Sequence, residues 1–214
     1  MKVNNYPVKT PAAGDRLFGS DSNGDQKQFD MSAVSNNVFQ YEIGEYAENQ
    51  GGVIFHRYLN GDTQNYLVVE LTDLSTSKTW SNITNVAIGS TAQSTWNGST
   101  NSTAIVNQSG FTDGAVKLCL DSTANSQSDW YLPSLDELSL LWQNRFNVNI
   151  TLSGNSESGI IPFATQILGN GYWSSTELSS TNVYVFSFAE GALAATLAKS
   201  TNTYYTRAIR KFSI

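Results

Sequence analysis

The sequence predicts an α+β fold of antiparallel strands and two short helices, preceded by an extended N-terminal arm. Only 14% of the 214 residues are charged, while Ser, Thr and Asn are abundant, and this composition favours strands and turns over long helices. Short apolar runs are separated by turn dipeptides such as Asn-Gly, which is the pattern of β-hairpins. Residues 134–145 combine a helix-start signal with helical periodicity.

The predicted arm comprises residues 1–40. Residues 11–30 have the pattern of two short strands around a tight turn at Asn23-Gly24, because Asn-Gly readily adopts the positive φ of hairpin turns. A segment this short cannot bury its own core, so we expect it to pack on the main domain or to attach the protein to a partner. Asp21, Asn23 and Asp25 alternate like the start of a calcium loop, but the required Gly and distal Glu are missing. No metal site is expected there.

The main domain begins at residues 37–46 with an apolar pattern that fits either a linking strand or a brief helix. A hairpin is predicted next, with strands at 52–58 and 65–72 joined by a turn at 60–62. Residues 75–103 are predicted to form a long polar loop, and a loop of this length in a compact domain is usually functional or held by its neighbours. Further elements are expected as a helix at 113–121, an irregular segment at 147–171, and strands at 171–176, 182–188, 191–197 and 203–212.

The clearest predicted element is the helix over residues 134–145. Pro133 moves the preceding residue out of the helical region, and Ser134 and Glu137 have the spacing of a capping box. Acidic residues in the first turn also suit the helix dipole. The apolar face of this helix is predicted to contain Leu135, Leu138, Leu141 and Trp142.

Charge and hydrophobicity exclude several classes of function. The net charge of −6 leaves no basic stripe to neutralise phosphates, so neither nucleic acid nor an anionic membrane is an expected partner. No apolar run approaches the roughly 18 residues of a membrane span. Residues 1–7 lack the apolar core of a signal peptide. We therefore expect neither membrane insertion nor conventional export.

Reactive side chains are too few for the common catalytic and metal sites. His56 is the one histidine and lies inside a predicted strand, which disfavours a Ser-His-Asp set. The single Cys119 lies in an apolar run and is expected to be a buried small hydrophobe, so the usual zinc ligands are lacking. Asp136 and Glu137 point roughly 100° apart on a helix, and capping already explains Glu137. The sequence thus predicts a protein that is not an enzyme and needs no cofactor.

Three blocks of sequence resemble a known family: Asp129–Leu138 (DWYLPSLDEL), Tyr172–Glu177 (YWSSTE) and Arg207–Phe212 (RAIRKF). The family comprises bacterial and phage domains and includes the C-terminal domain of collagen-like adhesins, whose fold is similar to the C-type lectin-like fold. The resemblance implies a C-type lectin-like domain over residues 41–214, with a twisted antiparallel sheet and two short helices. It also extends to Gly51–Phe55, Tyr66–Leu71, Trp80, Asn101–Val106 and Ala115–Leu120.

The sequence departs from two other relatives of that fold. Calcium-dependent sugar-binding lectins carry Glu-Pro-Asn or Gln-Pro-Asp with Trp-Asn-Asp and paired disulfides, and none of these motifs occurs here. Sulfatase-modifying oxidases need two reactive cysteines, whereas this chain has one. We expect neither calcium-dependent sugar binding nor oxidase activity.

Aromatic and amide side chains are the predicted ligand contacts. Trp96 lies in the polar loop with Asn97 and Asn101 nearby, and this combination suits a neutral glycan, because the indole stacks on an apolar sugar face while amides bind hydroxyls. Packing of Trp96 back onto the domain is the alternative. Tyr204 and Tyr205 alternate in a strand, so one of them is expected to point outward. The core is predicted to contain Trp130, Trp142 and Trp173.

Together with the resemblance, these features predict a phage virion fibre or projection protein that binds a host-surface receptor, a glycan or a protein, without catalysis. We expect a homotrimer in which residues 1–40 attach to other virion proteins. Localisation in the virion fits a chain without an export signal, since particles assembled in the host cytoplasm leave by lysis. Two alternatives stay open: a purely structural decoration or joining protein of the virion, and a bacterial surface adhesin, which requires an export route.

Overall fold

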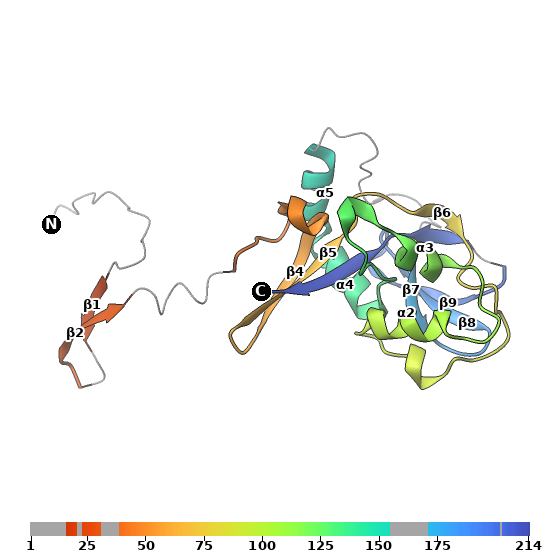
Figure 1. Ribbon diagram of the computed structural model, residues 1–214, viewed down its shortest axis with the longest axis horizontal. Coiled ribbons are helices and arrows are strands. Elements are labelled where there is room, and N and C mark those ends of the chain that lie inside the picture. Colours follow the sequence, from red (N-terminus) through yellow and green to blue (C-terminus); the bar gives the residue numbers. More distant parts are fainter. Residues whose placement is uncertain (1–15, 21–22, 31–38, 155–170, 202) are drawn as a thin grey trace. The chain divides into compact units, whose positions relative to one another are not determined.

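The computed structural model describes residues 16–20, 23–30, 39–154, 171–201 and 203–214, and the chain divides into two compact units, Met1–Gln40 and Tyr41–Ile214 (Figure 1). In the N-terminal unit, β1 (Arg16–Ser20) pairs antiparallel with β2 (Gln26–Asp30). Gly24 lies between them with a φ of 85°, as expected of an Asn-Gly turn. The predicted hairpin is therefore present, while Asp21 and most of the remaining arm lie outside the described residues.

The first sheet of the C-terminal unit contains the second predicted hairpin. It consists of β3 (Tyr46–Ala47), β4 (Gly52–Asn60), β5 (Thr63–Val69) and β11 (Ile209–Ser213), in the order β11-β5-β4-β3. All neighbouring pairs are antiparallel, and the turn between β4 and β5 passes through Gly61, whose φ is 60°. Residues 39–45, for which the sequence left strand and helix open, form bends and turns that lead into β3.

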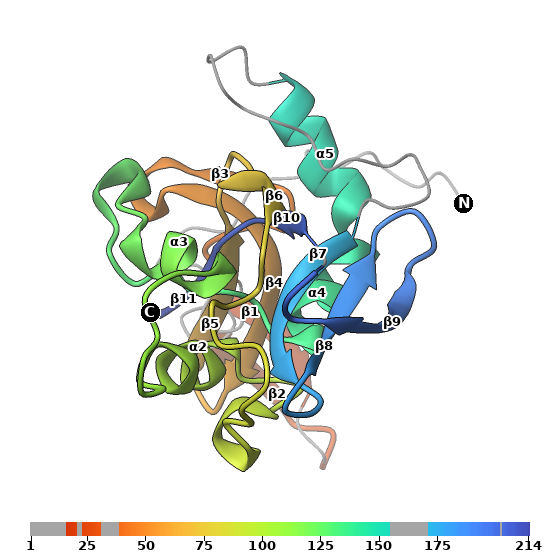
Figure 2. The ribbon, with the colours of Figure 1, turned by 90° about the vertical axis from the view of Figure 1, so that its right-hand side faces the viewer.

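The second sheet is built mainly from the C-terminal part of the chain. It consists of β6 (Ser75–Lys78), β7 (Gly171–Glu177), β8 (Asn182–Ser187), β9 (Ala192–Ala198) and β10 (Tyr204–Thr206), in the order β6-β10-β7-β8-β9 (Figure 2). β10 runs parallel to β7, whereas the other neighbouring pairs are antiparallel.

The prediction of one continuous strand at 203–212 is wrong, because the segment is divided between the two sheets as β10 and β11. The break falls at Arg207 and Ala208. Arg207 is 2% exposed, and its Nε donates to Asp73 Oδ1 at 2.7 Å. The carbonyl of Ala208 accepts from the amide of Glu70 at 3.1 Å. A buried guanidinium needs such a partner, so this ion pair holds the chain where it passes from one sheet to the other.

Two helices occur where the sequence pattern predicted none. α2 (Gly98–Val106) lies at the end of the predicted polar loop and beyond it, and α5 (Arg145–Gly154) includes the first eight residues of the segment predicted to be irregular. α2 begins at Asn97, whose Oδ1 accepts from the amide of Thr100 at 3.1 Å. It buries Asn101 and Ser102 together with Ile105, so it lacks the apolar stripe by which amphipathic helices are found.

Both predicted helices are present. α4 (Leu135–Gln143) starts with the predicted capping box of Ser134 and Glu137. α3 (Ala115–Asp121) begins after Gly114 and has no side-chain cap. The cap predicted at Thr112-Asp113 is absent, because the Asp113 carboxylate instead pairs with Lys78 at 2.7 Å. Three 3-10 turns, η1 (Glu48–Gln50), η2 (Ser90–Ala92) and η3 (Ala124–Ser126), complete the connections.

The core lies where α4 packs against strands of both sheets (Figure 2). Trp80, Trp130 and Trp173 are fully buried, and each indole donates to a backbone carbonyl, at 2.8, 3.3 and 2.6 Å. Cys119 is buried, as predicted. Trp142, predicted in the core, is half-buried and donates to the carbonyl of Phe188. The prediction of an α+β fold is confirmed.

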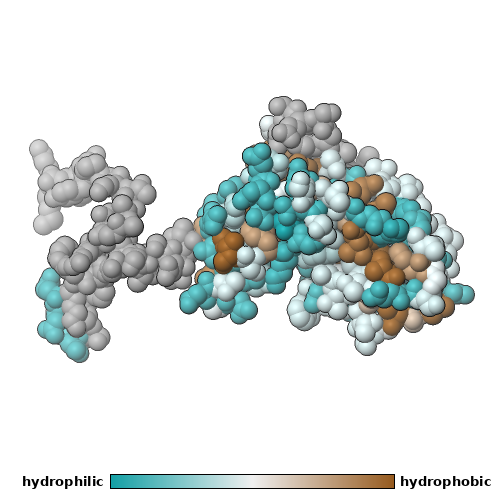
Figure 3. All heavy atoms as spheres, viewed as in Figure 1, coloured by the Kyte–Doolittle hydropathy of each residue, from teal (hydrophilic) through white to brown (hydrophobic). Residues whose placement is uncertain are grey.

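The surface in the view of Figure 3 is mostly hydrophilic, with small hydrophobic patches on the C-terminal unit. None of the described helices has the length and apolar character needed to cross a membrane.

Candidate binding groove

A groove of about 730 Å³ lies between the four-stranded sheet and the first turns of α2 and α4. One wall comes from β4, β5 and β11, and the other from the segment before α2, the start of α4 and the chain just before α4. The lining residues are His56, Tyr58, Leu67, Trp96, Asn97, Ser99, Asp129, Tyr131, Asp136, Glu137, Leu140, Lys211, Phe212 and Ser213.

Trp96 lines this groove, and its backbone is held on both sides. The side chain is 72% exposed. Before it, the Thr95 carbonyl accepts from the amide of Asp136 at 2.7 Å. The amides of Trp96 and Asn97 donate to Ser94 Oγ at 3.3 and 3.0 Å. An exposed aromatic ring on a fixed backbone is a ready surface for stacking, because little conformational freedom is lost on binding.

The other amides of the predicted site have different positions. Asn97 lies on the groove wall, where its Oδ1 caps α2. Asn101 is fully buried behind the wall. Its Oδ1 accepts from the amide of Ser94 at 3.1 Å, and its Nδ2 donates to the Ser94 carbonyl at 2.6 Å and to Ser175 Oγ at 3.3 Å. Asn101 thus fixes the backbone two residues before Trp96 and does not line the groove.

Tyr204 and Tyr205 are not among the residues that line the groove. Both are half-buried in β10. The Tyr204 ring packs edge-on against Trp173, with ring centroids 4.9 Å apart. Tyr205 packs against Tyr172 at 5.5 Å. The two tyrosines that the sequence predicted as ligand contacts therefore contribute to aromatic packing around β7.

Glu137 is the most highly connected carboxylate of the groove. Its Oε2 accepts from the Ser134 amide at 2.7 Å, the Ser134 hydroxyl at 2.8 Å and the Gly98 amide at 3.1 Å. Its Oε1 accepts from the Tyr131 hydroxyl at 2.9 Å. Burial raises the pKa of Glu137, although the hydrogen bonds from Ser134, Tyr131 and Gly98 oppose this shift. The carboxylate ties α4 to the first turn of α2 and so shapes the groove.

The two other carboxylates differ from each other. Asp129 is paired with Arg210, which donates from Nε to Oδ1 at 2.5 Å and from Nη2 to Oδ2 at 3.0 Å. Asp136 is exposed, and its carboxylate forms no hydrogen bond or ion pair within the described part of the chain. Asp136 is therefore the carboxylate of the groove that remains available to a ligand.

The opposite wall is a row of side chains across the sheet. His56 lies opposite Leu67, and Leu67 lies opposite Lys211. Tyr58 follows two positions after His56, with the two rings 5.9 Å apart, and the ammonium of Lys211 lies 5.3 Å from the centroid of the Tyr58 ring. Burial lowers the pKa of His56, which keeps the imidazole neutral at pH 7.

No local pattern in the sequence connects His56, Tyr58 and Lys211 with Trp96. The alternation of His56 and Tyr58 in a predicted hairpin was a usable signal, because residues two apart share one face of a strand. Their position opposite Trp96, however, depends on contacts between segments that are about 40 residues or more apart in the chain.

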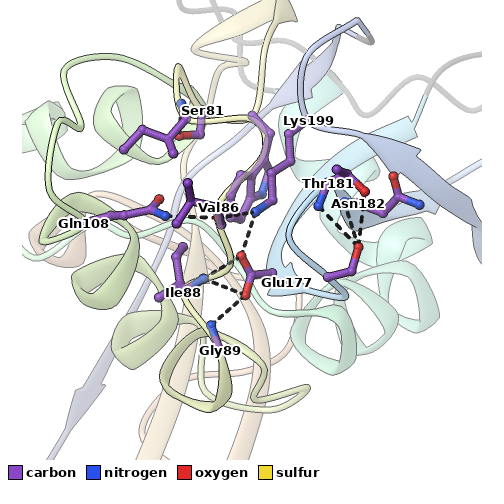
Figure 4. Close-up of polar contacts among 12 residues, drawn as sticks. Ser81, Val86, Ile88, Gly89, Gln108, Glu177, Thr181, Asn182 and Lys199 are labelled. Carbon is purple, nitrogen blue, oxygen red and sulfur yellow. Dashed lines mark hydrogen bonds and ion pairs between the residues drawn. The ribbon is translucent and has the colours of Figure 1, made fainter.

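A second polar cluster holds the segment that leads to Trp96 (Figure 4). Lys199 and Glu177 form an ion pair with Nζ and Oε1 2.6 Å apart, and neither side chain is exposed. Glu177 Oε2 accepts from the amides of Ile88 and Gly89 at 3.0 and 2.8 Å. Next to Glu177, Thr176 Oγ1 donates to the Ser94 carbonyl at 2.9 Å. The end of β7 thus anchors the chain at two points before Trp96.

Comparison with known families identifies the matched part of the chain. A family model described as the Lcl C-terminal domain matches residues 70–210, which is more than half of the sequence. The match includes the wall formed by Trp96, Asn97 and Asp136, whereas His56, Tyr58 and Lys211 of the opposite wall lie outside it. No curated protein matches the chain.

Proposed function

Because the chain belongs to the Lcl C-terminal domain family, we propose that it is an adhesin-like, surface-binding protein whose groove contacts a receptor on a host cell. The observation that carries this proposal is Trp96, an indole 72% exposed on a backbone that is held on both sides. Exposed aromatic side chains next to amide and carboxylate groups are typical of sites that bind sugars. The receptor class that best fits the groove is a glycan.

The proposal includes a place in a virion. We propose a phage fibre or projection protein, with residues 41–214 in a C-type lectin-like arrangement and residues 1–40 attaching to other virion proteins. In support of attachment, the described part of the N-terminal unit is a two-stranded sheet, and such a sheet by itself is marginally stable in water. Association as a homotrimer would give this unit a partner and would present three grooves at once, which strengthens weak binding.

Binding without catalysis fits the state of the acidic groups in the groove. Glu137 accepts four hydrogen bonds, and Asp129 is paired with Arg210. Both carboxylates stabilise the fold around the groove. Asp136 has no second free carboxylate beside it among the residues that line the groove, and general acid–base cleavage of a glycoside uses two.

The test is adsorption of the purified protein to host cells. We expect Trp96→Ala to reduce adsorption at least tenfold without changing the fold, because the side chain is mostly exposed. Phe146→Ala is the matched control, since Phe146 is an aromatic residue 73% exposed on α5 and does not line the groove. Equal adsorption of Trp96→Ala and the unmodified protein would overturn the proposal.

A joining or decoration role is the second candidate, and α5 favours it. Phe146 and Ile150 are 73% and 56% exposed and lie one helical turn apart. Adjacent exposed apolar side chains suit a contact with another protein. In this role Phe146→Ala would weaken incorporation into particles while Trp96→Ala would not, which is the reverse of the adhesion result. Incorporation is measured by mass spectrometry of purified particles.

A further inference from the structure

We infer that the groove selects an uncharged hexopyranose unit, which stacks on Trp96 and donates hydroxyl groups to Asp136. This inference rests on the proposed function and deepens it by naming the class of glycan. It assigns Asp136, Asn97, Tyr58 and Lys211 to recognition, and of these only Asn97 was a ligand contact predicted from the sequence.

The stacking surface and the acceptor lie next to each other. The hydrogen bond from the Asp136 amide to the Thr95 carbonyl, 2.7 Å long, joins the first turn of α4 to the residue that precedes Trp96. A pyranose has an apolar face of C–H groups and a rim of hydroxyls. A ring stacked on the indole therefore places its rim toward neighbouring polar groups. Asp136 offers two carboxylate oxygens with no partner in the described chain, which suits adjacent hydroxyl donors.

Donors complete the polar wall. The Oδ1 of Asn97 is used to cap α2, so its amide group presents Nδ2, which makes no hydrogen bond within the described chain. Across the groove, Lys211 and the Tyr58 hydroxyl add further donors. Hydroxyl groups can both donate to Asp136 and accept from these residues. Sugar hydroxyls are the ligand groups that match both kinds of partner.

The charged residues that line the groove disfavour acidic glycans. Three carboxylates line the groove, from Asp129, Asp136 and Glu137, against one lysine, Lys211. Arg210 balances Asp129, and hydrogen bonds from the fold satisfy Glu137. This leaves Asp136 and Lys211 as opposite charges exposed to the ligand. Asp136 lies on the same wall as Trp96, whereas Lys211 lies on the opposite wall. A sulfate or carboxylate group on a ring stacked on Trp96 would therefore be repelled by Asp136, and an uncharged ring would not.

Tryptophan fluorescence provides a direct readout, because Trp96 is exposed while the other four tryptophans are buried or half-buried. Protection of the 214-residue protein from acrylamide quenching is measured with lactose, maltotriose and mannotriose, and with sialyllactose and a heparin hexasaccharide. We expect at least one uncharged sugar to protect Trp96, and both acidic glycans to bind at least tenfold more weakly. Trp96→Ala should abolish the protection.

Asp136→Asn is the specific variant, since it removes the charge and keeps the shape. We expect it to weaken binding of the uncharged sugar at least fivefold, and Asp62→Asn, in the exposed turn between β4 and β5, to leave binding unchanged. On host cells, mild periodate, which cleaves vicinal diols, should remove adsorption, and sialidase should not.

Tighter binding of an acidic glycan, or equal binding by Asp136→Asn, would overturn the inference. If no sugar of the panel binds and periodate-treated cells still adsorb the protein, the inference is also wrong. In each of these cases, adsorption that depends on Trp96 would leave the proposed function standing. Adsorption that is independent of Trp96 would instead remove the proposed function itself.

Discussion

Lys199 and Glu177 form an ion pair that is closed to solvent on both sides, with Nζ and Oε1 2.6 Å apart and neither side chain exposed. The pair joins the residue that follows β9 to the last residue of β7. The ammonium also lies 5.0 Å from the centroid of the Trp80 ring and 3.4 Å from the carbonyl of Val86. Removal of one partner would leave the other charge buried without compensation, which costs far more than the loss of an exposed pair.

We therefore expect Lys199→Met to lower the free energy of unfolding by about 3–5 kcal/mol. Urea unfolding followed by circular dichroism measures the change. Lys117→Met is the matched control, because Lys117 forms an exposed pair with Asp121 on α3 and its loss should cost less than about 1 kcal/mol. Similar losses in both variants would show that the Lys199 pair contributes no more than a surface pair.

Glu70 is predicted to make stability depend on pH. It is 4% exposed, its Oε2 has no hydrogen-bond partner among the residues that the structure describes, and burial raises its pKa from an ordinary value of 4.5 to about 7. The folded state therefore binds the proton more tightly than the unfolded state. The contribution of Glu70 to stability is fully present below about pH 4.5 and is lost as the pH rises through about 7.

The variant Glu70→Gln has a side chain of nearly the same shape as a protonated glutamate, and it cannot lose a proton. It therefore removes the contribution of this position to the pH dependence of stability. Between pH 5 and pH 8, the free energy of unfolding of the unmodified protein should fall relative to that of Glu70→Gln, by on the order of 2–3 kcal/mol. Urea midpoints of both proteins at the two pH values measure the gain. A constant difference between the two proteins across this range would contradict the prediction.

Replacing Asn101 and replacing Trp96, which the sequence predicted as neighbouring ligand contacts, are expected to affect the stability of the protein differently. Asn101→Ala removes a buried side chain with three hydrogen bonds and leaves the amide of Ser94 without its partner, so we expect a loss of about 2–3 kcal/mol. Trp96→Ala should change stability by less than about 0.5 kcal/mol, because the ring is mostly exposed. Thermal unfolding of the two variants side by side tests this, and equal losses would place Trp96 in the fold rather than on the groove.

Elements with a local signal were predictable. The hairpin of β4 and β5 has alternating apolar residues and a glycine turn, and α4 has a proline before its capping box. The burial of Trp130 and Trp173 was predicted from their place in the blocks that resemble the family, whereas Trp80, in the predicted polar loop, was not predicted to be buried. Trp96 and Asn97 were predicted as ligand contacts because a polar loop that contains an indole is unusual in composition, and the structure places both on the wall of the groove.

Other features depend on partners that are far away in the sequence. α2 is a polar helix whose Asn101 bonds to Ser94 and Ser175, so its pattern resembles that of a loop. The division between β10 and β11 depends on Asp73, 134 positions before Arg207. The sequence predicted that either Tyr204 or Tyr205 points outward. In the structure each ring packs against an aromatic residue of β7, so both sides of this short strand are covered.

By itself, the sequence determined the α+β class and the capped helix α4, since each depends on residues within a few positions of one another. It also predicted the burial of Trp130 and Trp173, but it left open whether Trp96 is exposed or packs back onto the domain. Only the tertiary structure decided that Trp96 and Asp136 share one wall of a groove whose other wall is His56, Tyr58 and Lys211. It also decided that Asn101, Tyr204 and Tyr205 lie away from that groove. The physical reason is that a groove is formed by side chains from separate elements, and their relative position is set by long-range packing and by buried ion pairs.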